Sequence, residues 1–136
     1  MMKRIIACIG FSLLLGCNNN KEIKPETAMD AGRSFIRASL DGDFKTTETL
    51  LLKDSENSQL FESYKRTYSN LDETKKKEYK EASYNINKFE ELNDSTTIIN
   101  YSNSYMKKPM EIKLIRTEGN WLVDFKYTIA GNLPID

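Results

Sequence analysis

Histidine is absent from this chain of 136 residues. Imidazole is the usual general base near neutral pH and the commonest metal ligand in proteins. Its absence excludes catalytic triads of the Ser-His and Cys-His types, and it excludes zinc sites that need imidazole. The chain also lacks an excess of charge of either sign, because 20 basic residues balance 20 acidic residues. A nucleic-acid-binding protein usually has a basic excess, so no nucleic-acid partner is expected.

Cysteines and long hydrophobic runs are both scarce. The two cysteines, Cys8 and Cys17, fall near the start of the chain. A largely apolar run occupies residues 5–15 and follows Lys3 and Arg4. A helix needs roughly 20 residues to cross a bilayer, so this run is too short to remain as a membrane span. A positive segment followed by a short apolar run is typical of a secretory signal.

The apolar run ends in Leu14-Leu15-Gly16-Cys17, which resembles the lipobox of bacterial lipoproteins. In that family a diacylglyceryl group is attached to the cysteine sulfur and a dedicated peptidase cuts before the cysteine. The new amino group often receives a further acyl chain such as palmitate. The resemblance implies a signal peptide at residues 1–16, cleavage between Gly16 and Cys17, and attachment to a membrane through lipid on Cys17. The alternative is an ordinary secretory signal in which Cys17 is a chance thiol.

Residues 17–24 then comprise the lipidated cysteine and a polar tether. The seven residues from Asn18 to Lys24 would span roughly 15 Å as a flexible coil, so the folded part is expected close to the membrane. Among Gram-negative lipoproteins, an aspartate directly after the cysteine tends to hold the protein in the inner membrane. Because Asn18 stands there, the resemblance favours the outer membrane as the cell-envelope location if the host is Gram-negative.

The mature chain has no free thiol if Cys8 leaves with the signal and Cys17 carries lipid. Neither a disulfide nor a catalytic cysteine is then expected. Loss of Lys3 and Arg4 leaves a net charge of −2. Since a mildly acidic domain is not attracted to anionic headgroups, the lipid rather than a basic patch is expected to provide attachment.

Residues 25–136 are expected to form one domain that begins with helices. Pro25 and Glu26 suit the first turn of a helix. Gly42 can take the left-handed conformation that stops this helix, and Asp43 can cap the next one. Two further helices are predicted, one beginning near Asp54 or Ser55 and a charged one capped by Asp72 that runs to about Lys80. The apolar positions of the first helix recur at three- and four-residue steps and include Ala28, Ala31, Phe35 and Ala38.

From about residue 83 the apolar period changes towards two, which indicates strands. Strands are expected near residues 84–87, 96–105, 110–114 and 121–127, and the tail from residue 130 is expected to be irregular. Helices followed by an antiparallel meander with one apolar face indicate an α+β fold, with the helices packed on that face of a sheet of about four strands. The apolar face of the last strand is expected to contain Trp121, Val123, Phe125 and Tyr127.

A second resemblance covers most of the mature chain. The helix with Ala28, Phe35 and Ala38, the sequence Gly42-Asp43-Phe44, and the closing "EGNWLVDF" resemble small secreted domains of the nuclear-transport-factor-two-like superfamily. The resemblance implies a curved antiparallel sheet wrapped around helices, which together form a cone with an open end. Many such domains are lipoproteins of unknown function, and others are isomerases or dehydratases with a carboxylate base in an apolar pocket.

The candidate pocket residues are Asp124 in the closing strand and Tyr101 and Tyr105 on one face of an earlier strand. Burial would raise the pKa of a carboxyl group towards neutrality and suit it to act as a base. The alternative is that Asp124 faces solvent or caps a turn, and that the tyrosines are ordinary sheet aromatics. Trp121 could likewise stack on a sugar or another ring, or lie in the core. No cofactor or metal is expected, because "LDGDF" has two close aspartates but lacks the other ligands of a calcium loop.

Two hypotheses for function follow. The first is a non-enzymatic envelope lipoprotein that binds a partner protein or a small ligand through the open end of the cone or an exposed sheet face. The alternative is a small-molecule enzyme of the isomerase or dehydratase kind that uses Asp124 and a tyrosine. A cavity of several hundred cubic ångströms lined by Asp124 and Tyr101 would favour the enzyme.

Overall fold

The computed structural model describes residues 24–132, with side chains described for residues 24–128. The predicted signal peptide, the cleavage site at Gly16 and Cys17, the lipid on Cys17 and the tether before Lys24 lie outside the described residues. Four helices come first, and they are α1 (Ala28–Asp41), α2 (Phe44–Thr49), α3 (Ser55–Ser69) and α4 (Glu73–Glu81). The remaining elements are β1 (Tyr84–Asn93), β2 (Thr96–Asn103), β3 (Pro109–Thr117), β4 (Asn120–Val123) and α5 (Phe125–Asn132).

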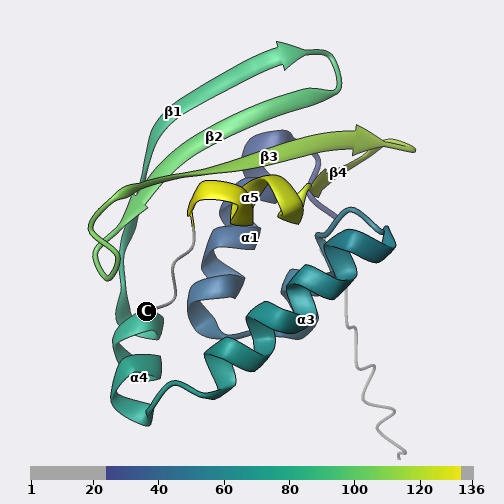
Figure 1. Ribbon diagram of the computed structural model, residues 1–136. Coiled ribbons are helices and arrows are strands. Elements are labelled where there is room, and N and C mark those ends of the chain that lie inside the picture. Colours follow the sequence, from purple (N-terminus) through teal and green to yellow (C-terminus); the bar gives the residue numbers. More distant parts are fainter. Residues whose placement is uncertain (1–23, 133–136) are drawn as a thin grey trace, which may run out of the picture.

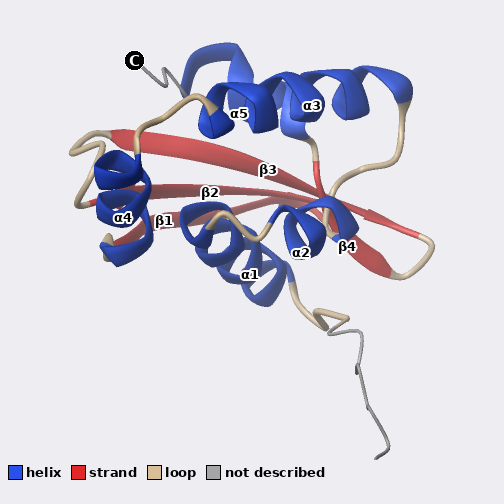
Figure 2. Cartoon of the chain, turned by 90° about the horizontal axis from the view of Figure 1, so that it is seen from below, coloured by secondary structure: helices blue, strands red, loops and turns tan. Residues whose placement is uncertain are grey.

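The strands form one antiparallel sheet in the order β1-β2-β3-β4, and the helices lie on one side of it (Figure 1). The sheet is open and curled, and α1 and α5 pack on its inner face (Figure 2). The predicted α+β class, with helices on a curved sheet of four strands, is confirmed. No helix within residues 24–132 has the length and apolar character that a membrane span requires.

Capping side chains set the start of each of the first four helices. The side chain of each cap accepts a hydrogen bond from a backbone N–H in the first turn, which satisfies one of the free donors there. The first helix begins at Ala28 rather than at Pro25, because Thr27 provides the cap and Pro25 precedes it. The caps are Thr27 for α1, Asp43 for α2, Asp54 for α3 and Asp72 for α4.

Gly42 ends α1 as predicted, and glycine is required there for two reasons. Its φ is 68°, in the left-handed region that favours glycine. A Cβ at this position would also lie 2.6 Å from the hydroxyl oxygen of Tyr68 on α3. The same glycine therefore turns the chain into α2 and lets α3 approach.

The inner face of the sheet forms the core against α1. The alternation predicted in β3 is confirmed, since Met110, Ile112 and Leu114 are fully buried while Glu111 and Lys113 face outward. Gly32 of α1 leaves no room for a Cβ against the Ile99 side chain of β2, so this helix sits directly on the strand.

The two edges of the sheet differ. The edge of β4 is covered by the segment after α2, because Val123 N–H donates to Leu50 O at 2.7 Å and Leu52 N–H donates to Val123 O at 2.9 Å. β1 is the other edge strand, and its pairing with β2 shifts register twice, between Ile86 and Lys88 and between Glu91 and Asn93. These bulges make β1 an irregular edge.

The last strand ends earlier than predicted. β4 stops at Val123, and residues 125–132 form α5 in place of a strand to Tyr127 and an irregular tail. Lys126 N–H donates at 2.7 Å to the buried Asn57 side chain of α3, which fixes the first turn of this helix. The Tyr127 hydroxyl donates to Glu111 at 2.9 Å, so this ring lies beside β3 and does not continue an apolar strand face.

Aromatic side chains from α1, α2, α3, α4 and α5 meet beneath the sheet. Phe61 has ring centroids of Phe44, Tyr64 and Phe125 within 6.1 Å, and Tyr68 reaches Tyr79 of α4. Such edge-to-face and stacked pairs stabilise a core beyond the area they bury. We call this group the aromatic cluster, and it consists of Phe35, Phe44, Phe61, Tyr64, Tyr68, Tyr79, Tyr105 and Phe125.

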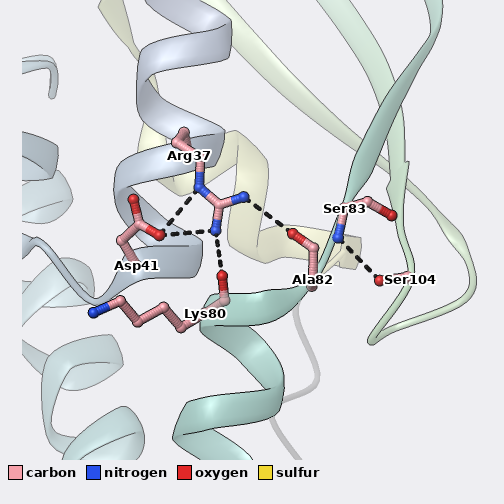
Figure 3. Close-up of polar contacts among 6 residues, drawn as sticks. All are labelled: Arg37, Asp41, Lys80, Ala82, Ser83 and Ser104. Carbon is pink, nitrogen blue, oxygen red and sulfur yellow. Dashed lines mark hydrogen bonds and ion pairs between the residues drawn. The ribbon is translucent and has the colours of Figure 1, made fainter.

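The Arg37 side chain of α1 contacts the C-terminal end of α4 (Figure 3). Its guanidinium donates to Lys80 O at 2.9 Å and to Ala82 O at 3.0 Å, and it pairs with Asp41 at 2.9 Å. These carbonyls lie at the C-terminal end of α4, where carbonyl groups lack helical partners and a positive charge is favourable. Arg37 therefore links the end of α4 to α1.

Candidate functional site

An open groove lies where β4 meets the segment after α2. The backbone bonds between Val123 and residues 50–52 hold the two sides together. The turn between β3 and β4 forms a third side, and it uses positive φ at both Glu118 (52°) and Gly119 (77°), as a tight hairpin requires. The groove has a volume of about 530 Å³. This is within the size range of small-molecule sites in proteins.

The wall of the groove mixes apolar and charged side chains. Trp121, the one tryptophan of the chain, is half-buried there, with Leu52 and Leu122 also half-buried. Lys24 and Lys53 are exposed beside them. We call this the Trp121 groove, and its lining residues also include Pro25, Thr49, Leu50, Thr117, Glu118 and Asn120.

The described part of the chain begins at this groove. Lys24 and Pro25, the first described residues, form part of its lining. A smaller hollow of about 370 Å³ shares Thr49, Leu52 and Lys53 with it and adds Lys45. The chain therefore enters the domain beside an amphipathic surface with several lysines.

Tyr101 does not line a substrate-sized cavity. It is 5% exposed and borders a space of about 10 Å³, which is the size of one water molecule. Tyr64 and Tyr79 border the same space. Burial raises the pKa of Tyr101 and of Tyr64 well above the usual tyrosine range, and it raises the pKa of Tyr79 to about 12. These phenols are therefore neutral donors inside the core.

Tyr105 lies in the turn after β2 and not on the strand face that was expected to carry it. The side chain of Asn103 shapes this turn by accepting hydrogen bonds from the N–H groups of Tyr105 and Met106, at 3.0 and 2.7 Å. The ring of Tyr105 packs on Tyr79, with centroids 4.6 Å apart. Tyr105 therefore closes the aromatic cluster at the end of α4.

Asp124 is buried at the junction of β4 and α5 rather than within a strand or facing solvent. Its backbone N–H donates to Lys113 O at 2.9 Å, and its carbonyl accepts from Thr128 N–H at 3.4 Å. Its Oδ1 is buried without a protein hydrogen-bond partner. Asp124 is not among the residues around the space that Tyr101 borders, so the two predicted pocket residues do not share it.

The two aspartates of "LDGDF" have structural partners. Asp41 pairs with Arg37, and Asp43 accepts from the backbone and side chain of Thr46, which lowers the pKa of this carboxyl group. Within residues 24–128 no group of three or more acidic, histidine or cysteine side chains is placed to hold a metal ion.

The outer face of the sheet offers a second surface, which is shallow and polar. A hollow of about 700 Å³ there is lined by amides and hydroxyls of β1 and β2 and by Lys107 and Lys108. Asn87 donates to Asn100 at 3.0 Å across the strands. Because these groups bind one another, this face has fewer free donors than its composition suggests.

No family model, curated protein or solved structure matches this chain. The sequence predicts Trp121 either in the core or against a ligand, and the structure places it half-buried on the groove wall, so Lys24, Leu52 and Lys53 are neighbours that the sequence did not predict. The sequence has no local signal for these neighbours, because the pairing of residues 50–52 with β4 joins segments about seventy residues apart.

Proposed function

We propose that this chain is a lipid-anchored lipoprotein of the bacterial cell envelope whose folded domain is a binding module. In this proposal residues 1–16 are removed, lipid on Cys17 holds the protein at the membrane, and the Trp121 groove takes a partner protein or a small ligand. In a Gram-negative host the location is the outer membrane.

The observation that carries the proposal is that the tether ends in the groove. Lys24 and Pro25 follow the lipobox-like sequence by only seven residues and line a space of about 530 Å³ beside Trp121. A half-buried tryptophan offers a ligand a large apolar surface and an N–H donor. The proposed anchor is thus only seven residues from the first residue of the candidate binding surface.

An isomerase or dehydratase is the alternative, and its geometry has less support. Such an enzyme needs a carboxylate base within a volume that holds the substrate. The space beside Tyr101 is about 10 Å³, and Asp124 is not part of its lining. The binding module needs no such pair of residues.

Replacement of the lipidated cysteine tests the attachment. We expect Cys17→Ser to leave the membrane pellet or to retain its leader, because an oxygen replaces the sulfur that accepts the lipid. Cys8→Ser is the matched control, since it also removes one thiol but leaves Cys17 intact. It should fractionate as the wild type does.

Fractionation and the mass of the mature N-terminus give separate readings. A Cys17→Ser protein that remains fully in the membrane and is processed normally would contradict the proposal. An unmodified thiol on Cys17 of the native protein would contradict it as well.

A further inference from the structure

We propose that the Trp121 groove faces the bilayer and that its ligand is the phospholipid surface, with Trp121 at headgroup level and Lys24 and Lys53 beside the phosphates. This inference rests on the proposed lipid anchor at Cys17. It adds an orientation for the domain, and it assigns the groove to the phospholipid surface in place of a partner protein or a small ligand.

The length of the tether limits which surface can meet the membrane. Seven residues span roughly 15 Å as a coil and at most about 25 Å when fully extended. A domain of this size has a radius of gyration of roughly 13 Å and is therefore wider than the coiled tether is long. Because Lys24 and Pro25 line the groove, the groove lies within one tether length of the lipid.

The side chains of the groove suit a membrane interface. Tryptophan concentrates at the headgroup level of bilayers, because its ring is apolar and its N–H is polar. Trp121 is half-buried on the groove wall, and the half-buried Leu52 and Leu122 also belong to the lining. Each of these side chains is already partly exposed, so it can contact lipid without a change in the fold.

The charge of the groove also favours this orientation. Lys24 and Lys53 are exposed on its lining against a single carboxylate, Glu118, whereas the mature chain has a net charge of −2. The adjoining hollow adds Lys45 and Glu48, one charge of each sign. This surface is locally basic on an acidic domain, so anionic headgroups attract it while they repel the rest. The lipid on Cys17 attaches the protein, and the groove orients it.

The single tryptophan allows a direct test. The native lipidated protein, purified from membranes, is reconstituted in vesicles of phosphatidylcholine and phosphatidylglycerol, with and without phosphatidylcholine brominated near the headgroup. We expect at least about two-fold quenching of Trp121 emission by the brominated lipid, and a shift of the emission to the blue relative to detergent solution.

A tryptophan placed at another site of the domain serves as the control. Trp121→Phe combined with Phe89→Trp moves the reporter to β1, at the opposite edge of the sheet, where position 89 is 38% exposed. We expect no quenching of that reporter.

A second variant tests the charge of the groove. Lys24→Glu combined with Lys53→Glu should lower the quenching of Trp121 in vesicles that contain phosphatidylglycerol, towards the value measured in vesicles of phosphatidylcholine alone. Circular dichroism verifies that each variant is folded.

The outcomes separate the two proposals. A protein that carries lipid on Cys17 but shows unquenched Trp121 emission, or equal quenching at positions 121 and 89, would overturn the orientation and leave the anchor intact. Native protein without lipid on Cys17 would overturn both proposals. If the two lysine substitutions leave the quenching unchanged, this result would contradict the placement of Lys24 and Lys53 beside the lipid phosphates.

Discussion

The aromatic cluster and the Trp121 groove use aromatic side chains in opposite ways. In the aromatic cluster, Phe61 and Phe125 are 1% exposed, and the space near Tyr64 and Tyr79 is about 10 Å³. In the groove, one half-buried tryptophan borders about 530 Å³ of open volume. The difference indicates that the aromatic cluster beneath the sheet stabilises the fold, whereas the β4 edge of the sheet has open volume beside a partly exposed ring.

The largest expected effect comes from emptying the aromatic cluster. Phe61→Ala should lower the free energy of unfolding by about 3–5 kcal/mol, because it removes a fully buried ring and leaves a cavity among tightly packed neighbours. Trp121→Ala, the matched truncation in the groove, should cost about 1–2 kcal/mol, since that ring is already partly in water. Urea denaturation followed by circular dichroism measures both values. Equal losses for the two variants would contradict the division between cluster and groove.

Alkaline pH should weaken the aromatic cluster and not the groove. Burial raises the pKa of Tyr79 from 10.0 to about 12, so the folded chain keeps its phenol neutral where the unfolded chain ionises. This stabilisation is complete below pH 10 and is lost as the pH rises from 10 through 12. At roughly 1.4 kcal/mol per pKa unit, the loss from this group approaches about 3 kcal/mol.

Denaturation at several pH values between 8 and 12 gives the slope for the wild type and for Tyr79→Phe. We expect a shallower decline in the variant, because it lacks one of the phenols that the unfolded chain ionises. Tyr64 and Tyr101 shift in the same direction, so part of the decline persists. A variant with the full wild-type slope would indicate that Tyr79 is accessible to water.

The smallest expected effect comes from releasing α4. Arg37→Ala removes the donors to Lys80 O and Ala82 O and should cost about 1–2 kcal/mol, because this side chain is 37% exposed and water replaces part of the interaction. Hydrogen exchange should accelerate in α4, and Trp121 fluorescence should not change. Arg33→Ala, at an exposed position of the same helix, is the control and should leave exchange in α4 unaltered.

Local signals in the sequence were enough to predict much of the fold. The sequence predicts Asp43 and Asp72 as helix caps, because a cap depends on residues only three positions apart. The alternation of β3 was equally readable, since each buried side chain is followed by one that faces outward. These features need no knowledge of distant contacts.

The missed features depend on contacts between distant segments. Trp121, Val123 and Phe125 alternate like a strand, yet the chain becomes helical after Val123, where Asn57 of α3 receives Lys126 N–H. The groove likewise exists because residues 50–52 pair with β4. Neither contact has a signature in the nearby sequence, so the candidate site could be predicted only as a lone tryptophan.

In the proposed lipoprotein many copies would share one membrane, and the irregular edge of β1 then gains importance. Anchoring to a membrane confines molecules to a plane, where neighbours collide far more often than in solution, and a straight exposed edge strand would let their sheets join edge to edge. The two bulges of β1 bend its row of hydrogen-bonding groups, and the charges of Lys88 and Glu90 line it. In the proposed lipoprotein, this irregular edge would disfavour strand pairing between crowded neighbours.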